Sequence, residues 1–199
     1  MKTIVLASGS PRRKTLLNKI DLTFTVTPSE VDEHYNPQWS PAEIVRTLAQ
    51  RKAEDIAPKY NHGLIIGADT IVAFNDSILE KPSSSSDAKT MLQKLSGKTH
   101  EVLTGVTLIK TDNDNNIISQ TTFVEKTEVI FGDLDPKLVN AYVATGSPMD
   151  KAGAYGIQDP HGALFVKEIR GDYYNVVGFP LHRFYNTMKS FAPDFLAHQ

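Results

Sequence analysis

The chain has 199 residues, of which 40% are hydrophobic and 22% are charged, as in an ordinary globular protein long enough to bury a core. Its formal net charge of −2 argues against strong sequence-independent binding to nucleic acid, and the absence of cysteine excludes disulfides and thiolate chemistry. No segment reaches membrane-spanning length, and the N-terminal apolar run is too short for a signal peptide. We therefore expect a cytoplasmic protein with neither a membrane nor a nucleic-acid partner.

A strand, a turn and a helix are predicted at the start of the chain. Residues 3–7 form a short apolar run rich in β-branched side chains, and Ser10 and Pro11 suit the cap and the first position of a helix. The turn between them presents backbone N–H groups, hydroxyls and the guanidinium groups of Arg12 and Arg13, which match phosphate oxygens. It is therefore either a polyphosphate-binding turn or an ordinary strand–helix turn whose arginines are solvated.

An acidic segment and an amphipathic helix follow. Residues 21–29 alternate as a second strand and lead into residues 30–33, which include Glu33. Ser40 then opens a helix with a capping box and proline at its first position. Lys52 lies on or beside the apolar face of this helix, so its side chain either extends to the helix edge or meets a charged partner.

The most strand-like run covers residues 64–72 and is apolar on both sides of Asp69. Such a run predicts a central strand covered on both faces. Burying a carboxylate in such a strand destabilises the fold unless the carboxylate is paired, hydrogen-bonded or bound to a metal. The alternative is an aspartate at a strand end or bulge that caps a loop, but the apolar flanks favour a functional role. Asn75 and Asp76 are expected to close a hairpin.

The remaining elements alternate between helices and strands. A helix capped by Ser86 or Asp87 is expected to end at Gly97. Residues 97–99 resemble the end of a Walker A loop, but the first glycine of that motif and the strand that precedes it are both missing, so we reject a P-loop. Residues 147–162 form a long loop of the kind that is functional or mobile. The other expected elements are strands over 101–110, 117–131 and 163–169, a helix from Asp135 to Gly146, an extended segment over 173–177, and a helix over 179–191 with Tyr185 on its inner face, followed by a frayed tail after Pro193.

Carboxylates and basic side chains are the groups available for catalysis. The histidines are scattered, a structural zinc site is not expected without cysteine, and no GxSxG motif is present. Carboxylates suit Mg²⁺ or Mn²⁺ bound together with phosphate oxygens, and a carboxylate near the metal can take a proton from water. Basic groups neutralise charge on a phosphoryl group. The set, which favours metal-assisted phosphoanhydride hydrolysis, consists of Glu30, Asp32, Glu33, Asp69, Arg12, Arg13, Lys52 and Lys81.

Motifs spread over nearly the whole chain occur in the order found in one enzyme family. They are LASGSPRRKTLL, VDE at 31–33, GADTIV at 67–72, EKP at 80–82, LSGKTHEVLTGV at 95–106, DKAGAYGIQ at 150–158 and GDYYNVVGFPL at 171–181. Together they resemble the Maf family of nucleoside triphosphate pyrophosphatases. The resemblance implies one α/β domain over residues 1–199, with a mixed, strongly curved central sheet flanked by helices and two lobes around a cleft. It also implies a homodimer that cleaves a nucleoside triphosphate between the α and β phosphates with a divalent metal.

The resemblance assigns roles to individual positions. Asp69 corresponds to the general base, which also touches the metal, and Glu33 corresponds to a second metal-binding carboxylate for Mg²⁺ or Mn²⁺. The positions that correspond to substrate-binding residues are Ser8, Arg12, Arg13, Lys52, Thr70, Lys81 and Gln158.

Arg12, Thr70 and Gln158 fall at positions that differ between branches of the family. This chain resembles the dTTP/UTP branch at all three positions, whereas the 7-methyl-GTP branch carries Trp, Gln and Glu there. Gln158 can offer both a donor and an acceptor to a pyrimidine edge. We therefore expect hydrolysis of dTTP and UTP, including modified pyrimidine nucleotides. The alternatives are the 7-methyl-GTP branch and a non-catalytic, nucleotide-sensing regulator of cell division.

Overall fold

The computed structural model describes residues 2–75 and 77–196, and the chain divides into two compact units. Neither unit is a continuous stretch of sequence, because the chain passes between them four times. The first unit comprises Met1–Asp69, Thr104–Glu125 and Gly178–Gln199, and the second comprises Thr70–Leu103 and Lys126–Val177.

The first unit contains the predicted strand, turn and helix at the start of the chain. Strand β1 (Thr3–Leu6) pairs in parallel with β3 (Gly63–Phe74), and helix α1 (Pro11–Asn18) begins after Ser10, whose side chain accepts a hydrogen bond from a backbone N–H as predicted. Strand β2 (Thr25–Val26) is shorter than the predicted 21–29, because only these two residues reach parallel register with β1.

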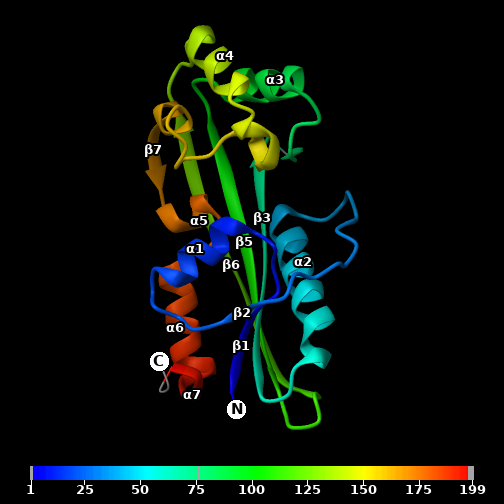
Figure 1. Ribbon diagram of the computed structural model, residues 1–199. Helices are drawn as coiled ribbons and strands as arrows, with labels where there is room; N and C mark the ends of the chain where they lie inside the picture. Colours follow the sequence, from blue (N-terminus) through cyan, green and yellow to red (C-terminus); the bar gives the residue numbers. More distant parts are fainter. Residues whose placement is uncertain (1, 76, 197–199) are drawn as a thin grey trace. The chain divides into compact units, whose positions relative to one another are not determined.

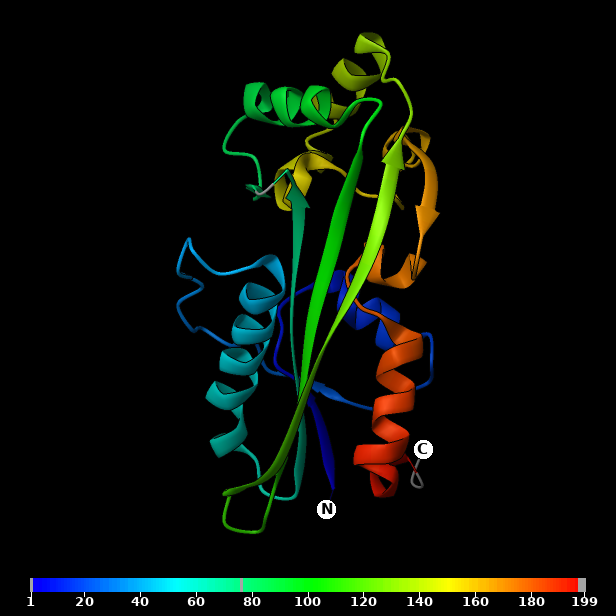
Figure 2. The ribbon, with the colours of Figure 1, turned by 180° about the vertical axis from the view of Figure 1, so that it is seen from behind.

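Two helices lie on opposite sides of the strands in this unit, α2 (Pro41–Ile56) on one and α6 (Leu181–Phe191) on the other (Figures 1 and 2). The predicted capping box of α2 is present. Glu43 Oε2 accepts the Ser40 N–H at 2.8 Å, and Ser40 Oγ accepts the Glu43 N–H at 3.3 Å. A short 3₁₀ helix, η1 (Ala57–Lys59), ends this segment.

The helix α2 approaches the strands at two glycines. A Cβ added to Gly67 would lie 2.2 Å from the Ala49 carbonyl oxygen, and one added to Gly105 would lie 2.2 Å from the Val45 carbonyl oxygen. Any larger side chain at either position would push α2 away from the sheet. The absence of a side chain at these two positions thus sets the distance between α2 and the sheet.

The end of the chain differs from the prediction at two places. Tyr185 of α6 is 47% exposed and does not belong to the inner face, because Leu181, Phe184 and Met188 fill it. The prediction of a frayed tail after Pro193 was wrong for the described residues, since α7 (Pro193–Leu196) is a short helix with a buried Phe195. Residues 197–199 lie outside the described residues.

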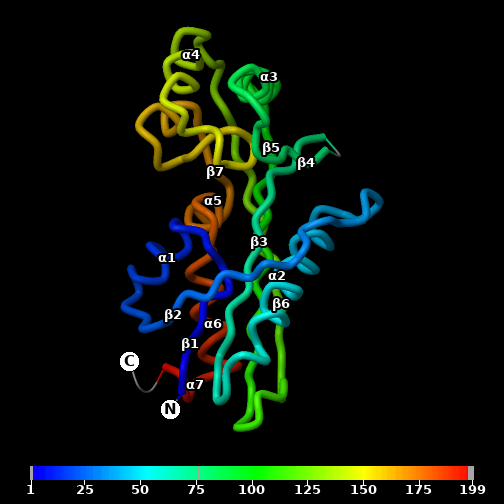
Figure 3. The backbone as a smooth tube through the Cα atoms, turned by 45° about the vertical axis from the view of Figure 1, so that its right-hand side comes forward, coloured from blue at the N-terminus to red at the C-terminus, as the bar shows by residue number. Residues whose placement is uncertain are grey.

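The second unit holds a separate core rich in aromatic side chains. Strand β4 (Ser77–Leu79) pairs antiparallel with β3, which confirms the predicted hairpin, although Asp76 lies outside the described residues. Helices α3 (Ser85–Leu95) and α4 (Pro136–Ala144) pack against each other within this unit (Figures 1 and 3). Gly97 and Gly146 end these helices in the left-handed conformation, as predicted.

Two predictions in the second unit were wrong. The cap of α3 is Ser84 rather than Ser86 or Asp87, because the Ser84 hydroxyl accepts the Asp87 N–H at 3.1 Å. Residues 173–177 form helix α5 (Tyr173–Val177) rather than an extended segment. The Asp172 carboxylate accepts the Tyr174 N–H at 2.7 Å and starts this helix, so local capping overrides the β-propensity of its side chains.

The predicted long loop over 147–162 contains two short 3₁₀ helices, η2 (Ser147–Asp150) and η3 (Ala152–Ala154). A third, η4 (Gly162–Phe165), delays the start of β7 (Val166–Arg170), which pairs antiparallel with β6 (Ile117–Phe131). The predicted strand from residue 163 therefore begins at Val166.

The strands form one mixed sheet in the order β2-β1-β3-β5-β6-β7, with β5 spanning Thr99–Thr111 and β4 paired to β3. The predicted α/β class, with a mixed central sheet and flanking helices, is confirmed. Among the described residues, every helix is too short or too polar to cross a membrane.

Candidate active site

The side chain of Lys52 meets two carboxylates in the first unit. Its Nζ lies 2.6 Å from Asp69 Oδ1 and 2.7 Å from Glu33 Oε1. Lys52 and Asp69 are each 8% exposed, whereas the Glu33 side chain is 64% exposed. Of the two alternatives for Lys52, the charged partner is the one observed, and the buried carboxylate is compensated by a direct ion pair.

The position of Asp69 follows from the strand that carries it. Asp69 lies within β3, which continues to Phe74, so the alternative of an aspartate at the end of the strand was wrong. Two residues earlier, Gly67 allows α2 to approach closely, and α2 carries Lys52. The close packing of helix on strand brings the ammonium group to the carboxylate.

Arg13 connects the first turn to the strand of Asp69. Its Nη1 donates to Ser8 Oγ and to the Ala68 carbonyl, each at 2.9 Å, and its Nε donates to the Gly178 carbonyl at 3.1 Å. Burial lowers the pKa of Arg13, and the negative charge of Asp69 partly offsets this effect. Because Ala68 precedes Asp69, these bonds place the Ser8 turn beside the candidate base.

The other predicted residues divide between the two units. Arg12 lies in α1 of the first unit and is half-buried, and Thr70, the first residue of the second unit, is also half-buried. Lys81 and Gln158 belong to the second unit and are exposed. The structure therefore brings together Ser8, Arg13, Glu33, Lys52 and Asp69.

A sequence model of the family described as Maf-like protein matches residues 3–191 of this chain. The chain belongs to the Maf-like family. It is 49% identical over 189 residues to a dTTP/UTP pyrophosphatase of Geobacillus sp., covering 95% of this chain and 98% of that protein. It is also 48% identical over 193 residues to a dTTP/UTP pyrophosphatase of Salinibacter ruber, covering 97% of this chain and 93% of that protein. A protein of the same name from Bacillus cereus is 48% identical over 194 residues, covering 98% of this chain and 92% of that protein.

The two carboxylates of this Maf-like chain fit a divalent cation that arrives with a phosphate ligand. Within the described part of the chain, no three His, Asp or Glu side chains form a metal cage by themselves. Mg²⁺ commonly takes one or two carboxylates and completes its coordination shell with water and substrate phosphate oxygens. Asp69 and Glu33, which share one ammonium group, are the residues that could supply that partial set.

Sequence reasoning missed several contacts of this Maf-like structure. The carbonyl groups of Ala68 and Gly178 hold Arg13, and no pattern of side chains predicts such backbone acceptors. Asp32, counted with the candidate carboxylates, instead accepts the His34 N–H at 2.9 Å in a local turn. A second polar cluster lies around Asp159, which directly follows Gln158 in the chain, and its contacts with Tyr142 and Ser147 are not predicted by any local pattern.

Proposed function

We propose that this chain hydrolyses dTTP and UTP, including modified pyrimidine nucleotides, to the nucleoside monophosphate and pyrophosphate. Membership of the Maf-like family over residues 3–191 supports the proposal, as do the names of relatives about half identical to the chain over nearly its full length. The residues Arg12, Thr70 and Gln158 support the pyrimidine branch over the 7-methyl-GTP branch.

One observation carries the proposal, and it lies within the first unit. A buried carboxylate, Asp69, is paired with Lys52, and the residue before it is joined through Arg13 to the hydroxyl of Ser8. An acid, a cation and a strand–helix turn with hydroxyl and guanidinium groups are thus assembled at one place. These groups are the ones that hydrolysis of a phosphoanhydride requires.

In the proposed reaction, Asp69 accepts a proton from a water molecule whose oxygen attacks the α-phosphorus. The new oxygen–phosphorus bond forms as the bond from the α-phosphorus to the bridging oxygen of the β-phosphate breaks. Pyrophosphate leaves with that electron pair, and Arg12, Arg13, Lys52 and Lys81 offset its growing charge. Asp69 and Glu33 would hold Mg²⁺ or Mn²⁺, which neutralises phosphate charge when bound.

The remaining assignments concern the substrate and the assembly. Ser8 binds the triphosphate together with the basic residues, and Thr70 and Gln158 contribute to the choice of nucleobase. The two units serve as one functional domain over residues 1–199, and the protein is a cytoplasmic homodimer. Sedimentation equilibrium of the purified chain tests the dimer, and a single monomeric species would reject it.

A substrate panel tests the activity. The purified chain is incubated with UTP, dTTP, CTP, GTP and 7-methyl-GTP, with and without Mg²⁺ or Mn²⁺, and both pyrophosphate and monophosphate are measured. We expect UTP and dTTP to have the highest kcat/KM and the reaction to stop when the metal is chelated. Faster hydrolysis of 7-methyl-GTP would favour the other branch, and nucleotide binding without pyrophosphate release would favour a sensor.

The variant Asp69→Asn tests the proposed base. It retains the shape of the side chain but cannot take the proton, so we expect kcat to fall about a thousandfold, within the range of general-base catalysis. Circular dichroism should show the same secondary structure. The matched control is Asp55→Asn on α2, whose partner Lys59 is 3.9 Å away, and it should keep normal turnover. Near-native turnover in Asp69→Asn would exclude Asp69 as the base.

A further inference from the structure

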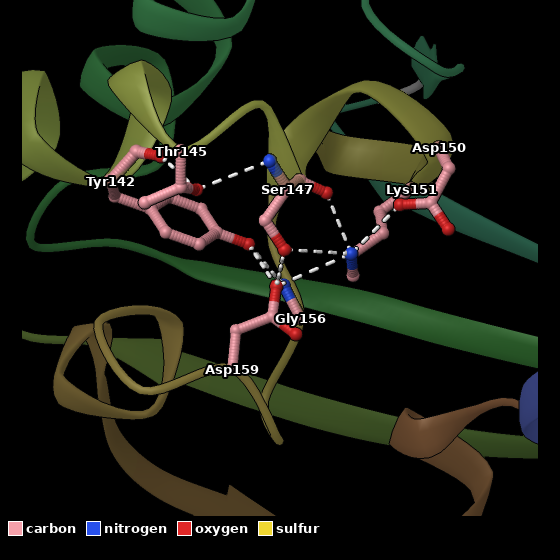
Figure 4. A network of polar contacts seen from close by, with 7 residues as sticks. All are labelled: Tyr142, Thr145, Ser147, Asp150, Lys151, Gly156 and Asp159. Atoms are coloured by element: carbon pink, nitrogen blue, oxygen red, sulfur yellow. Dashed lines mark hydrogen bonds and ion pairs between the residues drawn. The ribbon is translucent and has the colours of Figure 1, made fainter.

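Three donors converge on the carboxylate of Asp159 in the second unit (Figure 4). Asp159 Oδ2 accepts hydrogen bonds from the Tyr142 hydroxyl at 2.6 Å and the Ser147 hydroxyl at 2.7 Å. Lys151 Nζ lies 3.3 Å from the same oxygen. These partners come from α4, from η2 and from the segment between η2 and η3, so one oxygen atom joins three parts of the chain.

The donors are themselves held in place. Lys151 Nζ donates to the Ser147 carbonyl at 2.6 Å and to Asp150 Oδ1 at 2.7 Å. The Thr145 hydroxyl accepts the Ser147 N–H at 3.1 Å, so the backbone of η2 is fixed at its first residue. Figure 4 shows these bonds as one connected network around Asp159. Lys151 and Ser147 are therefore each held by further contacts of their own.

The network also holds the backbone on both sides of Gln158. The Gly156 N–H donates to the Tyr142 hydroxyl at 3.0 Å, and the Asp159 N–H donates to the Gly156 carbonyl at 3.0 Å. A Cβ added to Gly162 would lie 2.2 Å from that same carbonyl oxygen, so the two ends of the loop pack backbone against backbone. Gln158 sits inside this closed turn, next to the anchored carboxylate.

The side chains of Asp159 and Lys151 are more buried than the side chain of Gln158. The side chain of Asp159 is 19% exposed and that of Lys151 is 11% exposed, whereas Gln158 is exposed. Burial alone raises the pKa of Asp159, but the bonds from Tyr142 and Ser147 and the charge of Lys151 lower it overall. The carboxylate therefore remains ionised and keeps its donors, while the neighbouring amide is presented to solvent.

We propose that Tyr142, Ser147 and Asp159 are positioning residues that hold the backbone around Gln158 in place and thereby set the nucleobase preference of the enzyme. This inference rests on the proposed function, in which Gln158 contacts a pyrimidine. A side-chain amide can offer its donor and acceptor to one base edge only if the backbone that carries it is held at a fixed place relative to that base. The ligand class is a pyrimidine with a carbonyl acceptor beside an N–H donor, as in uracil and thymine.

The test measures kcat and KM separately for UTP, dTTP, CTP and GTP. Tyr142→Phe and Asp159→Asn remove the central bonds, and Ser147→Ala is a milder third variant in case Asp159→Asn folds poorly. We expect KM for UTP and dTTP to rise about tenfold with kcat nearly unchanged, and the preference for UTP over CTP to fall by a similar factor. Gln158→Ala should show the same change in preference.

The matched control is Ser96→Ala, which removes a hydroxyl that accepts the Leu134 N–H at 2.8 Å in the same unit. This variant should lower Tm without changing the nucleotide preference. An equal loss for all four nucleotides in the Tyr142 and Asp159 variants, or a loss that follows Tm as in the control, would overturn the inference.

The outcome for Gln158→Ala separates two kinds of failure. If it changes the preference while Tyr142→Phe and Asp159→Asn leave the preference intact, the positioning role is wrong and the contact with the base stands. If Gln158→Ala leaves the preference intact while pyrophosphate is still released, both the base contact and its positioning are rejected, although the pyrophosphatase activity is not.

Discussion

Two buried cations of the first unit are compensated in different ways. Lys52 is paired with the carboxylates of Asp69 and Glu33, whereas Arg13 donates to a hydroxyl and two backbone carbonyls. The lysine contacts are ionic and face a group that is proposed to react. The arginine contacts join β3, the first turn and Gly178, so Arg13 also holds the local backbone around Asp69. Loss of Arg13 would therefore disturb the base as well as any contact with phosphate.

His100 is a buried titratable residue of the second unit outside the proposed reaction. It is 2% exposed, and its Nε2 lies 2.8 Å from the Tyr155 hydroxyl. Burial lowers the pKa of His100 from 6.5 to about 4. Between these pH values the unfolded chain binds a proton that the folded chain excludes. The free energy of unfolding should therefore fall as pH falls through this window, by up to about 3 kcal/mol from this residue.

Urea unfolding at pH 7, 6, 5 and 4.5 measures this effect. The wild type should lose more stability over the series than His100→Gln, which cannot take up the proton. Carboxylates that titrate in the same range contribute to both proteins, so the difference between the two curves isolates His100. Parallel curves would show that His100 does not control the acid sensitivity.

At the scale of the elements, the packing of α2 on the strands is the contact on which the site depends. Gly67 leaves room for the helix backbone, and Lys52 reaches Asp69 from that helix. Gly67→Ala places a Cβ 2.2 Å from the Ala49 carbonyl oxygen, so α2 must shift. We expect a loss of about 3 kcal/mol in the free energy of unfolding, the upper end for overpacking, with reduced kcat in the folded fraction.

Gly132→Ala is the matched control for this prediction. Nothing lies within 4 Å of a Cβ added at Gly132, so the same chemical change should cost little. Urea unfolding and pyrophosphate release are measured for both variants. Equal stability of the two would show that α2 can move without cost and that the glycine does not set its distance.

At the scale of the whole molecule, the two units are interleaved along the chain. Strands β3, β5 and β6 each contribute residues to both units, and neither unit consists of one continuous fragment of the chain. We expect the units to unfold in one cooperative transition, because unfolding either one releases strands that continue into the other.

Fluorescence of single tryptophans tests this cooperativity. Trp39, the single tryptophan of the chain, reports on the first unit. Leu164→Trp, introduced together with Trp39→Phe, reports on the second unit at a side chain that is 67% exposed. The two urea midpoints should coincide within error, and separate midpoints would show that the units unfold independently.

Local signals determined most of the elements. Four local signals were each sufficient to predict the element that carries them, because each acts through the backbone of its own segment. They are the capping residues Ser10 and Ser40, the apolar run of β3 and the glycine at position 97. Residues 173–177 were mispredicted because their β-branched and aromatic side chains favour a strand, whereas Asp172 caps a helix there.

The motifs also identified the residues of the candidate site, but their contacts depend on the tertiary structure. Whether Lys52 extends to solvent or meets Asp69 depends on how closely α2 packs on β3, which two glycines control from different strands. The network around Asp159 likewise joins residues separated by up to seventeen positions. Sequence determines which groups are present and how each segment begins and ends, whereas long-range packing decides which of these groups meet.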